Sequence, residues 1–190
     1  PQQALANAGR IMQETGADAV KLEGGRGIQE QIRAITGAGI PVCAHIGMTP
    51  QSYHAFGGFK VQGRSLEAPK RVIEDAVAVE KAGAFAVVLE CVPARLAEYI
   101  SGILTIPTIG IGAGAGCGGQ VLVYQDMLSM YSDFTPKFVK KFADVGSVMR
   151  GAFEDYNRAV KDGSFPAAEH GFKINDEVLA AVTGRDGSEL

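Results

Sequence analysis

The sequence has few cysteines and no excess of charge of one sign, and both shortages narrow its possible roles. Its three cysteines, Cys43, Cys91 and Cys117, are isolated and odd in number, which argues against a disulfide framework and favours a reducing setting. We therefore predict a cytoplasmic protein. The net charge of −3 does not favour binding to nucleic acid or to an anionic membrane. No apolar run approaches the ~20 residues of a membrane span. We expect neither nucleic acid nor membrane as a partner.

The hydrophobic residues, 46% of 190, can bury a sizeable core as one domain, and they alternate between two periods along the chain. Short apolar runs rich in β-branched residues predict strands, and stretches with helical spacing of apolar residues predict helices that end at glycine. Strands are expected over 17–23, 40–45, 85–90, 107–112 and 121–124, and helices over 2–15, 28–35, 69–82 and 93–103.

This regular alternation of strand and helix predicts an α/β fold with parallel strands. A doubly wound sheet and a (β/α)8 TIM barrel both satisfy the pattern. We favour the barrel because polar residues stand at the carboxyl ends of several different strands. A whole barrel has about eight units in ~250 residues, so the expected strands correspond to strands 4 to 8 and roughly the first three units are lacking. We predict a partial barrel with a C-terminal helix over 1–172.

The C-terminal part of the chain predicts one long helix and then a polar extension. An apolar stripe runs from Phe138 to Val160 with helical spacing, which suits either the last barrel helix facing the core or a subunit interface. We expect the core-facing helix. The segment 173–190 is polar apart from a short apolar patch over 178–182, and it carries no recognisable chemistry.

Lys21 and Glu23 are the first candidates for a site. They stand two apart on an expected strand, so they point to the same face, roughly 7 Å apart. A mutually satisfied Lys–Glu pair at a strand end would explain them structurally. The functional alternative is a cation for an anionic substrate beside a carboxylate for a metal.

Glu90 and His45 end two further strands in the same manner. Glu90 follows a wholly apolar run, which suits a general base, although a strand-end glutamate can simply reach solvent. His45 lacks another His or Cys at metal-ligand spacing, which argues against zinc, and a hydrogen-bonded structural role would also explain it.

A glycine-rich loop over 110–116 follows the fourth expected strand. It resembles a dinucleotide fingerprint only superficially, because no helix follows at once. We expect these small residues to leave room for a large ligand, with Cys117 a bystander.

Two stretches have the period of neither helix nor strand, so packing alone does not explain them: 43–52, and Phe56-Gly57-Gly58-Phe59-Lys60-Val61-Gln62-Gly63-Arg64. These two stretches resemble the ketopantoate hydroxymethyltransferase family, and so do five further segments that follow the family's order along the chain: 20–25, 89–93, 109–114, 136–138 and 165–172. The resemblance covers residues 1 to about 172 and implies a barrel of the phosphoenolpyruvate/pyruvate type.

The resemblance also implies an activity. The family transfers a hydroxymethyl group from 5,10-methylenetetrahydrofolate to 3-methyl-2-oxobutanoate, giving 2-dehydropantoate for pantothenate and coenzyme A, with Mg²⁺ as cofactor. By the match, Glu90 is the catalytic proton acceptor, Lys21 binds the substrate carboxylate, His45 lies in the substrate pocket, and Glu23 is the magnesium-site glutamate. The family assembles as a decamer built from dimers, so a homo-oligomer is expected.

The sequence departs from the family pattern in two places. The family's direct aspartate ligands to magnesium lie on early strands, and no segment matches them; the loop also has Gly116-Cys117-Gly118-Gly119-Gln120 where an aspartate is expected before the second glycine. Two alternatives to the transferase remain, a metal-dependent 2-oxo acid lyase or mutase of the same superfamily and an inactive truncated barrel. An incomplete barrel would expose strand edges and core, so we predict poor solubility.

Overall fold

The computed structural model describes residues 1–48, 67–131 and 134–184. Its centre is a sheet of five parallel strands in the order β1-β2-β3-β4-β5, with each strand beside its neighbour in sequence. The strands are β1 (Val20–Glu23), β2 (Val42–Gly47), β3 (Ala86–Glu90), β4 (Thr108–Ile111) and β5 (Gly119–Gln120).

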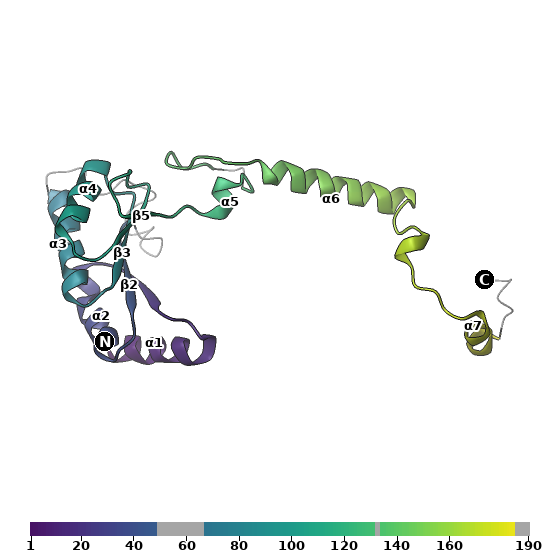
Figure 1. Cartoon of the computed structure of the whole chain (residues 1–190), viewed down its shortest axis with the longest axis horizontal. Helices are drawn as coiled ribbons and strands as arrows, with labels where there is room; N and C mark the ends of the chain where they lie inside the picture. The colour runs from purple at the N-terminus through teal and green to yellow at the C-terminus, as the bar shows by residue number, and fades with distance from the viewer. Residues whose placement is uncertain (49–66, 132–133, 185–190) are drawn as a thin grey trace.

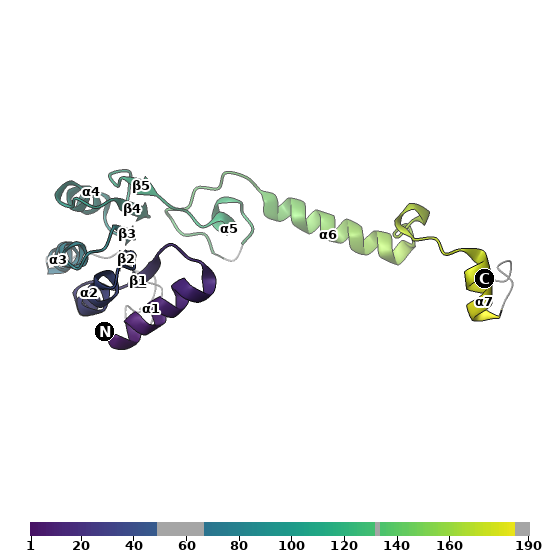
Figure 2. The ribbon, with the colours of Figure 1, turned by 60° about the horizontal axis from the view of Figure 1, so that its bottom comes forward.

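The helices between the strands lie along one face of this sheet. Figure 2 shows α2 (Gln29–Gly37), α3 (Glu67–Lys81) and α4 (Ala94–Ile103) beside the column of strands, with α1 (Gln2–Thr15) at the β1 edge. A doubly wound fold would reverse its strand order and cover both faces. Sequential order with helices on one face is the arrangement of a (β/α) barrel, so the predicted α/β class and barrel order are confirmed.

The core lies between the helices and the covered face of the sheet. Alternate strand residues point to the same face, and Val42, Ala44 and Ile46 of β2 join Val87 and Leu89 of β3 in one apolar cluster. The helices complete the cluster with fully buried side chains at helical spacing: Ile32 and Ile35 of α2, Ala76 and Val79 of α3, and Ala97 and Ile100 of α4.

Three of the expected helix ends are glycines in the left-handed region. Gly16 ends α1 with φ 67°, and Gly39 and Gly83 follow α2 and α3 with φ 82° and 96°. Residues other than glycine rarely adopt this backbone conformation, which is why a glycine marks the end of each of these helices.

The fifth strand was expected over 121–124, and this prediction is wrong. β5 is Gly119–Gln120, the ladder closes where the Val121 amide donates to the Gly110 carbonyl at 3.0 Å, and Tyr124 begins the short helix α5 (Tyr124–Met127). The β-branched run suggested a strand, but Val121 and Val123 are each 47% exposed and have no apolar layer to pack against.

The long C-terminal helix is shorter than predicted and does not face the core. α6 (Val145–Asp162) begins where the Asp144 side chain accepts a hydrogen bond from the Ser147 amide, so 138–144 lie outside it, and none of its residues is buried. Figure 1 shows α6 extending away from the sheet, followed by a 3₁₀ turn (Ala168–His170) and α7 (Asp176–Thr183). The expected contact with the core is therefore wrong for this chain.

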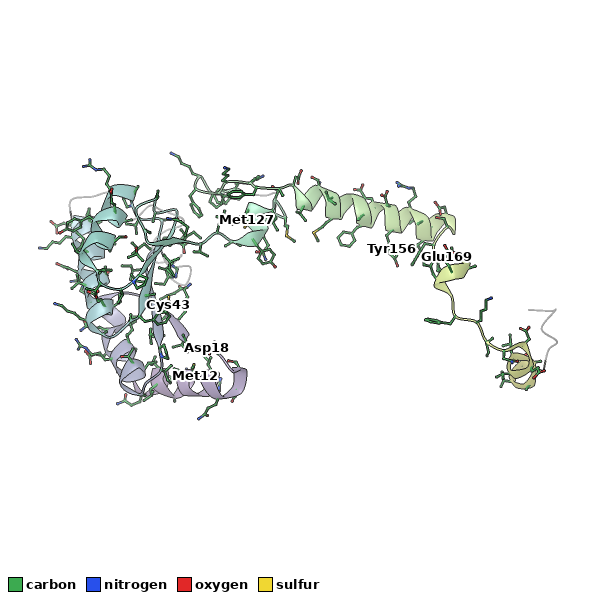
Figure 3. All side chains as sticks on the ribbon, in the orientation of Figure 1. Met12, Asp18, Cys43, Met127, Tyr156 and Glu169 are labelled. Carbon is green, nitrogen blue, oxygen red and sulfur yellow. The ribbon has the colours of Figure 1, made fainter. Side chains whose placement is uncertain are left out.

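The apolar stripe of α6 is exposed. Phe153 and Tyr156 are 66% and 59% exposed, and Figure 3 shows Tyr156 on α6 far from Cys43 on the sheet. Among the described residues, no helix combines the length and apolar character needed to cross a bilayer. The polar extension predicted over 173–190 contains α7, whose N-cap Asn175 accepts from the Glu177 amide at 2.8 Å.

Candidate active site

Three ionisable side chains meet on the sheet face opposite α2, α3 and α4. Glu23 and His45 are direct partners in the β1–β2 register, and His45 is the partner of Val88 in the β2–β3 register. Glu90 stands two residues after Val88 on β3, so it points to the same face. Parallel pairing therefore brings together residues that are separated by more than 20 and 40 positions in the chain.

His45 lies between the two carboxylates. Its Nδ1 is 3.5 Å from Glu23 Oε1 and its Nε2 is 3.0 Å from Glu90 Oε2. The imidazole is 1% exposed, while the Glu23 and Glu90 side chains are 15% and 13% exposed. The buried ring thus places one carboxylate on each side of itself, and both carboxylates reach the open face.

Neither nitrogen of His45 makes a well-aligned hydrogen bond, despite these short distances. Leaving a buried polar group without a hydrogen bond costs about 1–3 kcal/mol, so a purely structural histidine would be expected to find a better partner. Catalytic hydrogen bonds are often poorly aligned before substrate binds. The arrangement therefore favours a functional role for His45.

The backbone around Glu90 is closely constrained. The Met48 amide donates to the Glu90 carbonyl, and the Cys91 amide donates to the Ile111 carbonyl, both at 2.9 Å. Cys91 has φ 53°, a left-handed conformation that is costly for a residue with a side chain. Gly47 has φ 93°, and a Cβ atom there would lie 2.3 Å from the backbone carbonyl oxygen of Glu90. Glycine at 47 is thus required for the chain to close against Glu90.

Lys21 lies on the same face at the start of the site. It pairs with Cys43 in the β1–β2 register and is exposed, two residues before Glu23. Burial raises the pKa of the Cys43 thiol, and the nearby Lys21 ammonium opposes this rise. Lys21 is therefore a cation available to an anionic ligand on the open face.

The turn after Glu23 is held by α3. The Gly24 amide donates to the His45 carbonyl at 2.9 Å, and the Arg26 amide donates to Asp75 Oδ1 at 2.9 Å. The Arg26 side chain also pairs with Asp75 at 3.3 Å. A Cβ atom at Gly25 would lie 2.1 Å from Asp75 Cγ, so only glycine allows this approach. These contacts fix the end of β1 and with it Glu23.

A magnesium ion fits this site only in part. Within the described ranges, no three His, Cys, Asp or Glu side chains gather closely enough to hold a metal ion. Mg²⁺ usually keeps several waters and binds through one or two carboxylates together with substrate oxygens. Glu23 could supply one such carboxylate, and the remaining positions would fall to water, substrate or residues outside the described part of the chain.

Comparison with known proteins identifies the family. A sequence model described as ketopantoate hydroxymethyltransferase matches residues 1–168. The chain belongs to the ketopantoate hydroxymethyltransferase family. Proteins named 3-methyl-2-oxobutanoate hydroxymethyltransferase from Enterococcus faecalis and Clostridium novyi are 66% and 63% identical to it, over 92% and 93% of the chain. The chain spans about 64% of the length of these relatives.

Solved structures give weaker likenesses than these relatives. A phosphonopyruvate hydrolase has a TM-score of 0.47 at 15% identity, covering 95% of this chain and 64% of the other. A putative lyase/mutase from Burkholderia cenocepacia has a TM-score of 0.39 at 16% identity, with the same shares covered.

The structure brings the ketopantoate hydroxymethyltransferase candidates Glu23, His45 and Glu90 into one cluster, with Lys21 on the same face. It places His45 between the glutamates, where each of its nitrogens lies near a carboxylate oxygen without a well-aligned hydrogen bond. Sequence reasoning missed the structural roles of Gly47 and Cys91, which fix the Glu90 backbone; a glycine just after the expected strand 40–45 was the available signal. Most of the family motifs over 43–52 and 56–64 lie outside the described residues.

The glycine-rich loop packs closely against its neighbours, and its role in leaving room for a large ligand stays a prediction. A Cβ atom at Gly114 would lie 2.4 Å from that of Ala94, and one at Gly112 would lie 2.7 Å from the Phe138 ring. Only glycine fits at 112 and 114, because Phe138 and α4 pack directly onto the loop. Cys117 lies in the same loop, where its Sγ would be 3.0 Å from a Cβ atom at Gly110.

Proposed function

We propose that the chain carries part of the active site for hydroxymethyl transfer from 5,10-methylenetetrahydrofolate to 3-methyl-2-oxobutanoate. The products are 2-dehydropantoate, for pantothenate and coenzyme A synthesis, and tetrahydrofolate, and one water supplies the new hydroxyl oxygen. Family membership supports the activity. The observation that carries the proposal is the pair of carboxylates, Glu23 and Glu90, on either side of buried His45.

Glu90 is proposed as the base. The substrate C3–H lies next to a ketone and is only weakly acidic, so its removal needs a positioned acceptor. The Glu90 carboxylate reaches the open face, while its backbone is held by Met48 and by the Cys91–Ile111 hydrogen bond. A base on a constrained strand end is held in place for proton transfer.

Lys21 and His45 are proposed to orient the reactants. The exposed ammonium of Lys21 offsets the substrate carboxylate charge and fixes its position along the sheet. His45 was expected to touch substrate, but at 1% exposure its nitrogens face Glu23 and Glu90. We infer that His45 acts on the substrate through these carboxylates.

Mg²⁺ belongs to the proposal through Glu23. When bound, the ion would supply Lewis-acid stabilisation of the negative charge that develops on the substrate keto oxygen. Glu23 is suited to hold it, because the hydrogen bonds of Gly24 and Arg26 keep the end of β1 in place.

A homo-oligomer and a cytoplasmic location complete the proposal. The exposed stripe of α6, which includes Phe153 and Tyr156, is more apolar than a solvated helix face requires and supports self-association. The three free cysteines support a reducing compartment.

Proton exchange at substrate carbon tests the proposal without folate. The chain is incubated with 3-methyl-2-oxobutanoate in D₂O, with and without Mg²⁺, and loss of the C3–H signal is followed by proton NMR. We expect magnesium-dependent exchange that falls roughly 10²–10⁴-fold in Glu90→Gln, the range for loss of a general base. Glu14→Gln, on the exposed side of α1, is the matched control and should exchange normally. A folded chain that shows no exchange would contradict the proposal.

A further inference from the structure

Glu90 and Val92 stand two positions apart in the chain, yet they lie on opposite faces of the sheet. The Glu90 carboxylate reaches the open face, whereas Val92 is 1% exposed and belongs to the apolar cluster between the sheet and its helices. In a strand that simply continued, residues two positions apart would share one face. The chain therefore turns over between these two residues, and the turn lies at Cys91.

Cys91 makes this turn with a left-handed backbone. Its φ is 53°, and Ser129 is the one other described residue with a side chain that has a positive φ. This conformation is unfavourable for any residue other than glycine, so another part of the fold has to offset it. The burial of Val92 is the nearest such source, because removing an aliphatic side chain from water is strongly stabilising.

The end of β2 packs against both sides of the turn. The Met48 amide donates to the Glu90 carbonyl at 2.9 Å. A Cβ atom at Gly47 would lie 2.9 Å from Val92 Cγ2, so the valine side chain packs directly on the bare backbone of Gly47. One short stretch of backbone therefore holds the carbonyl of Glu90 and the side chain of Val92 at the same time.

We propose that Val92 is a positioning residue for Glu90. The burial of Val92 holds the left-handed turn at Cys91, and this turn ends β3 with the Glu90 carboxylate on the open face. The inference rests on the proposed function, in which Glu90 removes the substrate proton, and it adds a residue that acts from within the core. Because Val92 acts through the backbone, its loss should slow proton removal and leave substrate binding unchanged.

Val92→Ala and Val79→Ala form a matched pair of variants. Both valines are fully buried in the same apolar cluster, and Val79 lies on α3 rather than on β3 or its turn. Each substitution removes the same atoms from the core, so both should lower the urea concentration at half-unfolding. Loss of stability alone therefore does not separate the two variants, whereas a loss of positioning does.

The catalytic readout is C3–H exchange of 3-methyl-2-oxobutanoate, followed by proton NMR in D₂O with Mg²⁺ over a range of substrate concentrations. We expect Val92→Ala to lower kcat per folded chain by up to roughly 10²-fold with KM unchanged, because a small displacement of a catalytic group can cost that much. We expect Val79→Ala to keep the kcat of the unchanged chain. Equal kcat values in the two variants would overturn the proposal, and so would a change confined to KM.

Amide hydrogen exchange tests the turn without any substrate. The amides of Met48 and Cys91 donate the two backbone hydrogen bonds on either side of Glu90, and NMR follows their exchange with D₂O. We expect both amides to exchange faster in Val92→Ala than in Val79→Ala, because the turn opens locally when its anchor is lost. The same protection in both variants would overturn the proposal.

A second pair of substitutions tests the turn even where Val92→Ala fails to fold. Glycine is unstrained at a positive φ and alanine is not, so Cys91→Gly should unfold at a higher urea concentration than Cys91→Ala. An alanine variant as stable as the glycine variant would show that residue 91 does not hold a left-handed turn, and it would overturn the proposal.

The unchanged chain separates this inference from the proposed function. If it exchanges the substrate proton and the two valine variants match it equally, the proposed function stands and the role of Val92 is overturned. If it exchanges no substrate proton, the proposed function is contradicted and Val92 loses its catalytic role, whereas the amide comparison still decides whether Val92 holds the turn.

Discussion

His45 Nε2 lies 3.0 Å from Glu90 Oε2, although the two residues stand on different strands and are offset by two positions in register. The contact is possible because both side chains point to the open face of a parallel sheet. It places His45 directly beside the proposed base and links Glu90 to Glu23 across one buried ring.

Replacing His45 should therefore impair proton exchange without removing the base. We expect His45→Gln to slow exchange by up to roughly 10²-fold, because a displaced catalytic group can cost that much. The NMR exchange assay measures the rate, and circular dichroism checks the fold. An exchange rate equal to that of the unchanged chain would show that His45 does not position Glu90.

Gly47→Ala should destabilise the chain and displace Glu90. The new Cβ atom would lie 2.3 Å from the backbone carbonyl oxygen of Glu90, and such overpacking typically costs about 1–3 kcal/mol. Gly9→Ala is the matched control, because a Cβ atom at Gly9 meets nothing within 4 Å and alanine favours the interior of α1. Urea unfolding should show a loss for Gly47→Ala and no loss for Gly9→Ala. Equal stability of the two variants would contradict the geometry.

Gly25 and Asp75 should be energetically coupled. Gly25→Ala places a Cβ atom 2.1 Å from Asp75 Cγ, so it should destabilise the chain by roughly 1–3 kcal/mol. Shortening the partner removes the clash, so Gly25→Ala with Asp75→Ala should cost less than the two single changes together. A double-mutant cycle from urea unfolding measures this coupling, and simple additivity would argue against the contact.

Glu80 should make stability depend on pH in the acidic range. Its Oε1 accepts hydrogen bonds from the Thr105 amide at 2.6 Å, the Thr105 hydroxyl at 2.8 Å and the Ile106 amide at 3.3 Å. Burial acts to raise the pKa of Glu80, but these hydrogen bonds outweigh it and lower the pKa below its ordinary value of 4.5.

The sign of the Glu80 effect follows from the lowered pKa. The stabilisation is fully present above the unfolded value and is lost as pH falls through the folded value. The advantage of the unchanged chain over Glu80→Gln, roughly 1 kcal/mol, should therefore be constant near neutral pH and shrink as the solution is acidified. Urea unfolding over a pH series measures it, with Glu14→Gln as the exposed control. An advantage that grows on acidification would contradict the assignment.

The apolar stripe of α6 should drive self-association. Phe153→Ser removes a large side chain that is 66% exposed, so we expect less association in sedimentation or light scattering. Asp155→Ser, two positions along and on the opposite side of the helix, is the control and should leave association unchanged. Equal association of the two variants would exclude this stripe as the contact.

The sequence was a good guide to the elements whose apolar spacing is regular. The helix 2–15 is observed with these bounds, and four of the five strands overlap their predicted ranges. The helix and the first three strands contribute residues to the apolar cluster that contains Val42 and Leu89, or pack against it. The run 121–124 failed because its β-branched residues have no layer to cover them. The stripe from Phe138 failed as a helix start because the Asp144 cap, a local hydrogen bond, sets the first turn.

The sequence predicts which residues belong to the site, but not how they are arranged. Strand-end positions indicated Glu23, His45 and Glu90, but only the parallel register shows that His45 lies between the two carboxylates. The approach of Phe138 to Gly112 could not be predicted, because it joins segments with no shared period. Such contacts depend on how loops fold over strand ends.

Glu23 and Glu90 are each the last residue of a strand, and the chain turns immediately after both. The position of each carboxylate is set by its strand. A longer or shorter loop after the strand would therefore change which molecules can reach the carboxylate, and it would leave the carboxylate in place. Acid–base machinery and substrate choice can therefore diverge independently in evolution on this framework, because they belong to different parts of the same strand–helix unit.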